Sequence, residues 1–159
     1  MKIFSFTGWS GSGKTTLISE LIIEFRKRGY RVMAVKNAPH KHHLEPEGKD
    51  SQKFLESGAE EVYLLSKGVL MNMRPVLNEE DFFNYALPEM EKYDFVLLEG
   101  IKKNGIPVFE IFNSRLENKL RTEISILSGI FSDIKVHPEI PYINRGKIIE
   151  IADFLEKFH

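Results

Sequence analysis

The chain contains no cysteine among its 159 residues. This absence excludes disulfides, metal centres that depend on thiolate ligands, and catalysis by a thiol. Long apolar runs are missing as well. No stretch approaches the roughly 20 uncharged residues that span a bilayer, and the apolar start is too short for a signal peptide. We therefore expect a cytoplasmic protein that does not interact with a membrane.

Neither sign of charge is in excess. The 22 basic and 23 acidic residues give a formal net charge of −1, whereas a general nucleic-acid binder normally has a basic excess. We therefore expect no nucleic-acid partner. An apolar fraction of 42% and a charged fraction of 28% are ordinary for a globular protein. The length predicts one domain over 1–159.

Strand-like and helical segments alternate along the chain. Apolar spacing and end signals predict helices over 14–27, 50–57, 79–92 and 146–158. Runs rich in β-branched and aromatic residues predict strands over 3–7, 31–36, 61–65, 69–73, 95–98, 107–112, 123–131 and 142–143. The alternation predicts an α/β fold of three layers, in which helices flank a mostly parallel central sheet.

A glycine-rich segment follows the first predicted strand and opens the first predicted helix. The phosphate-loop pattern G-x-x-x-x-G-K-[ST] is matched in full by Gly8, Trp9, Ser10, Gly11, Ser12, Gly13, Lys14 and Thr15. Its glycines let backbone N–H groups point at phosphate oxygens, and the helix adds its positive N-terminal end. We expect Lys14 to reach the β- and γ-phosphates, Thr15 to ligate Mg²⁺ and Thr16 to contact the α-phosphate. The segment predicts nucleotide binding.

An acidic residue ends one of the apolar strands. Glu99 follows the run 95–98, and ligands of open α/β sheets bind at the edge where such strands end. A carboxylate there can hold Mg²⁺ directly or through water, so we predict that Glu99 ligates the metal and acts with Lys14 in catalysis. An exposed strand-end glutamate is the alternative. Asp50 either caps the helix that it opens or provides a second Mg²⁺ contact.

Three histidines lie close together in a polar loop. His40, His42 and His43 have no fixed ligand geometry without a fourth partner such as Glu45 or Glu47. Three interpretations stay open for this loop: a solvated segment, a contact to an anionic ligand, and a metal site.

Together, these segments resemble one known family. GWSGSGKTTL at 8–17, VKNAPHKHHLEPEGKDS at 35–51, SGA at 57–59 and LLEGIKK at 97–103 are similar to the molybdopterin-guanine dinucleotide biosynthesis adaptor proteins, the MobB family. The similarity continues in FSD at 131–133 and in a C-terminal IADFL, so it covers most of the chain. One departure is Asn37, where the family often has histidine.

The resemblance implies a P-loop domain that binds GTP with Mg²⁺, hydrolyses GTP weakly and is usually a homodimer. The implied partners are the molybdopterin guanylyltransferase, which joins GMP to molybdopterin, and molybdopterin or its molybdenum form. It also implies phosphate contacts over 8–16 and acidic site residues at Asp50 and Glu99. For the dimer, 69–73 is either an exposed pairing edge or an internal strand.

Recognition of the base and the rate of hydrolysis are predicted separately. No Asn-Lys-x-Asp motif is present, and we hypothesise that Asp133 reads the base, because a carboxylate accepts from both guanine N1–H and the exocyclic amine. A plain loop aspartate is the alternative. No general base is evident near the γ-phosphate, and Gln52 is the only glutamine. We therefore predict slow hydrolysis.

Two other functions stay open. A small-molecule P-loop kinase also begins with a phosphate loop, but it normally carries an arginine-rich lid. Here Arg74, Arg115, Arg121 and Arg145 are scattered along the chain. A metal-insertion GTPase would instead use the histidine loop as its ligand.

Overall fold

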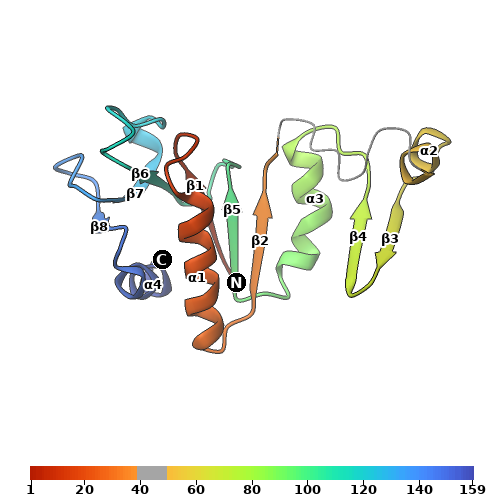
Figure 1. The fold of residues 1–159 in the computed structure, drawn as a ribbon, viewed down its shortest axis with the longest axis horizontal. Helices are drawn as coiled ribbons and strands as arrows, with labels where there is room; N and C mark the ends of the chain where they lie inside the picture. Colours follow the sequence, from red (N-terminus) through yellow and green to blue (C-terminus); the bar gives the residue numbers. More distant parts are fainter. Residues whose placement is uncertain (39–49) are drawn as a thin grey trace. The chain divides into compact units, whose positions relative to one another are not determined.

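A computed structural model of the chain describes residues 1–38 and 50–159 (Figure 1). The chain divides into two compact units, of which the first contains 1–37 and 88–159 and the second contains 38–87. The second unit is thus an insertion in the chain of the first, and one domain over 1–159 stays a prediction. Over the described residues, no helix combines the length and apolar character that a membrane crossing requires.

The first unit is built on a six-stranded sheet with the strand order β2-β5-β1-β6-β7-β8. Its strands are β1 (Lys2–Thr7), β2 (Val32–Lys36), β5 (Phe95–Glu99), β6 (Val108–Phe112), β7 (Leu127–Ser132) and β8 (Tyr142–Asn144). Each neighbouring pair runs parallel, which confirms the predicted α/β class with a mostly parallel sheet. Because the strands run the same way, their carboxyl ends meet at one edge of the sheet.

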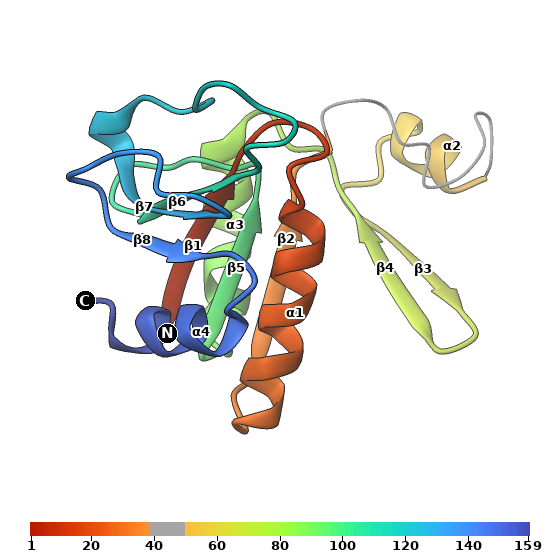
Figure 2. The ribbon, with the colours of Figure 1, turned by 60° about the vertical axis from the view of Figure 1, so that its left-hand side comes forward.

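Helices α1 (Lys14–Lys27) and α4 (Ile148–Lys157) cover one face of this sheet (Figure 2). The apolar residues of α1 recur at helical spacing, so that Leu21 and Phe25 fall on one buried stripe. Phe25 stacks on Phe95 of β5 with ring centroids 4.0 Å apart. The core of the first unit is therefore aromatic, and it fixes α1 against the middle of the sheet.

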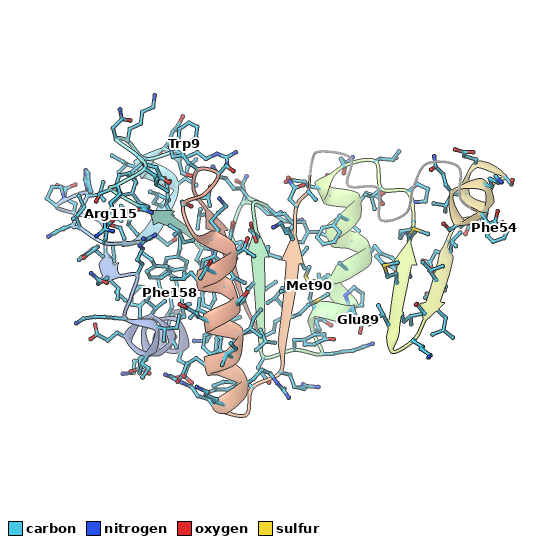
Figure 3. The ribbon with its side chains drawn as sticks, viewed as in Figure 1. Trp9, Phe54, Glu89, Met90, Arg115 and Phe158 are labelled. Atoms are coloured by element: carbon cyan, nitrogen blue, oxygen red, sulfur yellow. The ribbon has the colours of Figure 1, made fainter. Side chains whose placement is uncertain are left out.

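The second unit contains α2 (Asp50–Glu56) and a hairpin of β3 (Val62–Ser66) and β4 (Val69–Met73). The two strands are antiparallel and form a sheet of their own. Helix α3 (Glu79–Met90) begins in the second unit, and its last residues, from Pro88, belong to the first. Figure 3 shows the side chains that these elements carry, including Phe54 on α2.

One predicted strand begins too early. The run 123–131 predicts a strand throughout, but a 3₁₀ helix, η1 (Ile124–Ile126), precedes β7. The first residue of β7, Leu127, pairs with Val108, which is itself the first residue of β6. Residues before Leu127 therefore have no partner strand, and without one the β-branched isoleucines do not extend the ladder.

Candidate nucleotide-binding site

The loop between β1 and α1 curls tightly at the carboxyl edge of the sheet. Gly8, Gly11 and Gly13 have φ values of 143°, 81° and 97°, which residues with a Cβ rarely adopt. A Cβ on Gly8 would lie 2.4 Å from the carbonyl oxygen of Ile111, so only glycine fits there. Gly13 is the N-cap of α1, and its position brings the positive end of the helix to the loop. This geometry is that of a phosphate-binding loop.

The Lys14 side chain folds back over the loop. Its Nζ donates hydrogen bonds to the carbonyl oxygens of Gly8, at 3.0 Å, and Trp9, at 2.6 Å. Burial lowers the pKa of the Lys14 ammonium, and the nearby Glu99 carboxylate acts in the opposite direction. Lys14 is therefore a partly desolvated cation beside the loop. A bound phosphate would provide an anionic partner for the Lys14 ammonium and so offset the cost of its desolvation.

Thr15 and Glu99 lie in direct contact. The Thr15 hydroxyl is 3.0 Å from each carboxylate oxygen of Glu99, because the first turn of α1 lies beside the end of β5. Lys36, at the end of β2, places its Nζ 3.5 Å from Glu99 Oε1. The structure thus brings together two of the three predicted metal ligands. Hydroxyl and carboxylate oxygens are the donors that Mg²⁺ prefers, so this pair fits the ion.

The third predicted metal ligand, Asp50, belongs to the second unit. It is the first residue of α2, and its carboxylate is 3.5 Å from the Lys53 ammonium one turn later. Gln52 lies on the same helix. His40, His42 and His43 lie outside the described residues. Within 1–38 and 50–159, no group of three or more His, Asp or Glu side chains forms a metal-binding cluster.

Two arginines that the sequence pattern did not assign to the loop form hydrogen bonds with it. Arg121 donates from Nη1 to the Gly8 carbonyl oxygen at 3.0 Å, and Arg145 donates from Nη1 to the Ser12 carbonyl oxygen at 2.9 Å. They are scattered in the sequence, and only the fold gathers them. Arg145 directly follows β8, so the parallel sheet delivers it to the same edge as the loop.

A buried carboxylate ties the segment 113–122 to the sheet. Glu110 of β6 is fully buried and accepts the backbone N–H groups of Arg121, at 2.6 Å, and Thr122, at 2.9 Å. The Trp9 indole N–H donates to the Lys119 carbonyl oxygen at 3.1 Å. The segment is therefore fastened at both the strand and the phosphate loop. Its sequence signal is a single acid within the otherwise apolar strand VFEIF.

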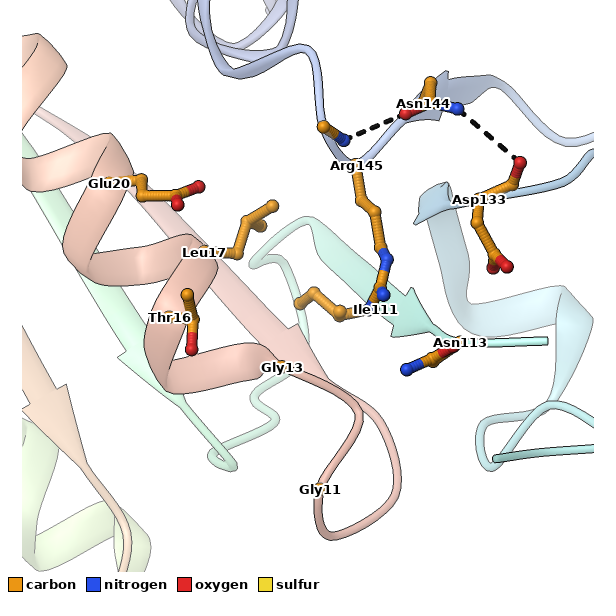
Figure 4. Close-up of a pocket in the computed structure, with 11 residues that line it drawn as sticks. Gly11, Gly13, Thr16, Leu17, Glu20, Ile111, Asn113, Asp133, Asn144 and Arg145 are labelled. Atoms are coloured by element: carbon orange, nitrogen blue, oxygen red, sulfur yellow. Dashed lines mark hydrogen bonds between the residues drawn. The ribbon is translucent and has the colours of Figure 1, made fainter. Parts of the chain in front are cut away.

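A cavity of about 480 Å³ opens beside the loop (Figure 4). The loop and α1 form one wall, and residues that follow β6, β7 and β8 form the other: Asn113, Asp133, Arg145 and Gly146, with Asn144 at the end of β8. Asp133 accepts from the Ser114 N–H at 2.9 Å and from the Ser114 hydroxyl at 2.5 Å. These two hydrogen bonds lower the pKa of the Asp133 carboxyl. Asp133 is therefore an ionised acceptor at the cavity wall.

Known proteins match the chain over most of its length. The molybdopterin-guanine dinucleotide biosynthesis adapter protein of Haemophilus influenzae is 28% identical over 158 residues, which cover 98% of this chain and 88% of that protein. The adapter protein of the same description from Escherichia coli strain K12 is 28% identical over 160 residues, which cover 96% of this chain and 90% of that protein.

Solved structures agree with the fold. A crystal structure described as molybdopterin-guanine biosynthesis protein B superposes with a TM-score of 0.70 at 28% identity, covering 97% of this chain and 96% of that chain. The structure of Bacillus subtilis MobB has a TM-score of 0.68 at 21% identity, covering 98% of this chain and 97% of that chain. With the loop between β1 and α1, these matches confirm the predicted P-loop NTPase fold.

A comparison with a model of a protein family gives the family assignment. The model of the family described as MobB, molybdopterin guanine dinucleotide synthesis protein B, matches residues 3–132. This range contains the phosphate loop, Lys36 and Glu99. The chain therefore belongs to the MobB family.

Proposed function

We propose that this chain binds GTP with Mg²⁺ in the loop 8–16, hydrolyses it slowly and acts as an adapter in the biosynthesis of molybdopterin guanine dinucleotide. The observation that carries the proposal is the curled loop between β1 and α1, with the Thr15–Glu99 pair at its side. Family membership supports the pathway, and the printed descriptions of the relatives support the adapter role.

The phosphates would lie along the loop. Backbone N–H groups of 8–16 and the helix end would bind the oxygens, and Lys14 would turn from the loop carbonyls to the β- and γ-phosphates. Thr15 and Glu99 would hold Mg²⁺, which supplies charge compensation for the phosphates when bound. Thr16 lines the cavity, so a nucleotide whose α-phosphate contacts Thr16 would extend its nucleoside into that space.

Asp133 is the proposed reader of the base. Each of its carboxylate oxygens accepts one hydrogen bond from Ser114, and each retains a second lone pair. Guanine offers two adjacent donors, N1–H and the exocyclic amine, whereas adenine presents an acceptor at N1. An ionised carboxylate therefore favours guanine and repels the adenine edge.

Slow hydrolysis is proposed from the chemistry around the loop. Arg121 and Arg145 contact carbonyl oxygens of the loop and supply positive charge, and the Glu99 carboxylate beside Thr15 is assigned to the metal rather than to a water. Charge stabilisation alone lowers the barrier, but it does not orient or deprotonate a water. The adapter role fits a protein that holds its nucleotide for a partner rather than turning it over.

The proposed protein partner is the guanylyltransferase that joins GMP to molybdopterin, and the proposed pathway ligand is molybdopterin or its molybdenum form. The small-molecule kinase and the metal-insertion GTPase are not favoured by the family match. For the kinase, the arginines at the loop remain a point of likeness, so the experiment that follows includes ATP and a phosphate acceptor.

Nucleotide titration followed by Trp9 fluorescence tests the proposal. Trp9 is the only tryptophan and lies within the loop, so a bound phosphate should change its emission. We expect GTP with Mg²⁺ to bind more tightly than ATP with Mg²⁺, with turnover below about 1 s⁻¹. Asp133→Asn should lose roughly tenfold or more of the preference, because an amide places a donor against guanine donors.

Asp94→Asn is the matched control for this titration, since Asp94 precedes β5 and lies at the opposite end of the strand from Glu99. It should retain the wild-type preference. Equal affinity of the wild type for GTP and ATP would contradict the guanine assignment. Tighter binding of ATP with rapid phosphate transfer to a small acceptor would favour the kinase instead.

The hairpin of the second unit is the proposed dimer contact. Leu65 of β3 and Leu70 of β4 are paired across the strands, with exposed fractions of 82% and 63%. Exposed apolar pairs on a two-stranded sheet favour burial against another chain, and we propose a second copy of this chain.

Light scattering after size exclusion measures this association. We expect the wild type to have the mass of a dimer and the double variant Leu65→Ser/Leu70→Ser to have that of a monomer. Ile149→Ser removes a similarly exposed residue on α4 and should stay dimeric. A monomeric wild type at tens of micromolar would contradict the proposal.

A further inference from the structure

Lys36 forms a closed triangle with the two proposed metal ligands. Its Nζ lies 3.5 Å from Glu99 Oε1 and 3.4 Å from Thr15 Oγ1, and the Thr15 hydroxyl is 3.0 Å from the same Glu99 oxygen. One ammonium thus contacts both side-chain oxygens that are proposed to hold Mg²⁺. Neither the sequence pattern nor the proposed function assigns Lys36 a role.

The backbone fixes this arrangement. Lys36 and Glu99 are directly opposite each other on the adjacent parallel strands β2 and β5, and the Asn37 N–H donates to the Glu99 carbonyl oxygen at 2.9 Å. The ends of the two strands are therefore held together, and the two side chains start from neighbouring positions. The Glu99 side chain is only 13% exposed, whereas the Lys36 side chain is 58% exposed. The carboxylate is thus confined, while the ammonium has a path to solvent.

In the part of the chain that the structure describes, Lys14 also lies near Glu99 but does not make this contact. Lys14 is attracted to Glu99 electrostatically, but its Nζ donates hydrogen bonds to the carbonyl oxygens of Gly8 and Trp9. Of these two lysines, Lys36 is the one whose ammonium contacts both Thr15 Oγ1 and Glu99 Oε1.

We propose that Lys36 occupies the cation position of this site before Mg²⁺ arrives, so that the metal binds together with the nucleotide rather than alone. The inference rests on the proposed function, because it takes Thr15 and Glu99 as the metal ligands. A divalent ion on these two oxygens would lie within a few ångströms of the Lys36 ammonium, where like charges repel strongly. The ion must therefore displace the ammonium.

A bound nucleotide changes this competition. Its phosphates add negative charge beside Glu99 and Thr15, which attracts the metal and offers the displaced ammonium new anionic partners. Among residues 1–38 and 50–159, Glu99 is the carboxylate that forms an ion pair with the Lys36 ammonium without a nucleotide, and Lys36 already neutralises it. Metal affinity is consequently low in the free protein and rises when nucleotide is present.

Binding of Mn²⁺ alone tests the inference. Free Mn²⁺ is measured by electron paramagnetic resonance during titration of nucleotide-free protein. We expect Lys36→Met to bind Mn²⁺ roughly threefold to fivefold more tightly than the wild type, the scale of a lost ion pair that is partly exposed. Lys27→Met removes the same charge at the far end of α1 and should match the wild type. Wild-type affinity in Lys36→Met would overturn the inference.

Two further variants locate the effect. The double variant Lys36→Met/Glu99→Gln should lose the increase in Mn²⁺ affinity, because the ion binds to the Glu99 carboxylate. Lys36→Arg keeps the positive charge and should bind Mn²⁺ as weakly as the wild type. Retention of tight binding in the double variant, or tight binding in Lys36→Arg, would overturn the proposed position. Each variant is first checked by circular dichroism and titrated only if it is folded.

Failure of this inference is distinguishable from failure of the proposed function. The Mn²⁺ titration contains no nucleotide, so it measures directly how Lys36 competes with the metal for Glu99. Failure of the proposed function appears as a wild-type protein whose Trp9 emission does not respond to GTP with Mg²⁺. A normal GTP response together with unchanged Mn²⁺ affinity in Lys36→Met overturns only the role of Lys36.

Discussion

Lys14→Met is expected to weaken the binding of GTP with Mg²⁺ by roughly tenfold to 100-fold, the scale of a hydrogen bond to a charged group. Methionine has a similar length and no charge, so it cannot bind phosphate oxygens. Burial lowers the pKa of the Lys14 ammonium, which means that the folded protein holds this charge at a cost. Lys14→Met should therefore leave the free energy of unfolding unchanged or slightly higher, and the loss of affinity is not a loss of folding.

The Trp9 titration measures this loss, and urea unfolding followed by circular dichroism checks stability. Lys27→Met is again the matched control, because it removes a lysine charge from the same helix at the end remote from the loop. It should bind GTP as the wild type does. If Lys14→Met also bound GTP with wild-type affinity, the loop would not be the phosphate site.

Gly8→Ala should lower the free energy of unfolding by about 3 kcal/mol or more, the sum of backbone strain and a steric clash. The added Cβ would lie 2.4 Å from the Ile111 carbonyl oxygen and 2.8 Å from Ser12 Oγ. The φ of Gly8, 143°, is also unfavourable for alanine. Because the clash is with backbone, the loop must move away from β6, and GTP binding should be lost with it.

Gly29→Ala separates the two causes. Gly29 has a φ of 88°, and a Cβ there would meet no atom within 4 Å, so only a backbone penalty of about 1 kcal/mol applies. Urea unfolding of both variants gives the comparison. Equal losses in Gly8→Ala and Gly29→Ala would show that the close approach to Ile111 does not constrain the loop.

Local patterns predicted the elements that carry the loop. The apolar spacing of 14–27 gives the bounds of α1 as observed, and the run 95–98 lies within β5. A match of eight consecutive residues between a strand and a helix is local information, so sequence alone reveals it. The runs 61–65 and 69–73 likewise predicted β3 and β4, but not that these two strands pair with each other in a sheet of their own.

Local sequence patterns do not predict contacts between residues that are far apart in the sequence. Arg145 reaches the loop because β8 ends at the same edge of the sheet, and Arg121 reaches it because Glu110 of β6 holds the Arg121 backbone there. Lys36 meets Glu99 because β2 pairs with β5, although β3 and β4 lie between these two strands in the chain. Strand order decides the positions of Arg145 and Lys36, and periodicity does not encode strand order. The early start predicted for β7 has the same origin, since propensity does not reveal where a partner strand begins.

The strand order has a consequence for the growing chain during synthesis. β1 lies between β5 and β6, yet the ribosome completes it almost 90 residues before either neighbour begins. Throughout that interval the nascent chain carries Phe4 and Phe6, both buried in the finished sheet, without the strands that cover them. Exposed apolar segments of this kind recruit chaperones or associate wrongly. β1 is therefore translated well before both of its neighbours and can complete its pairing only after them.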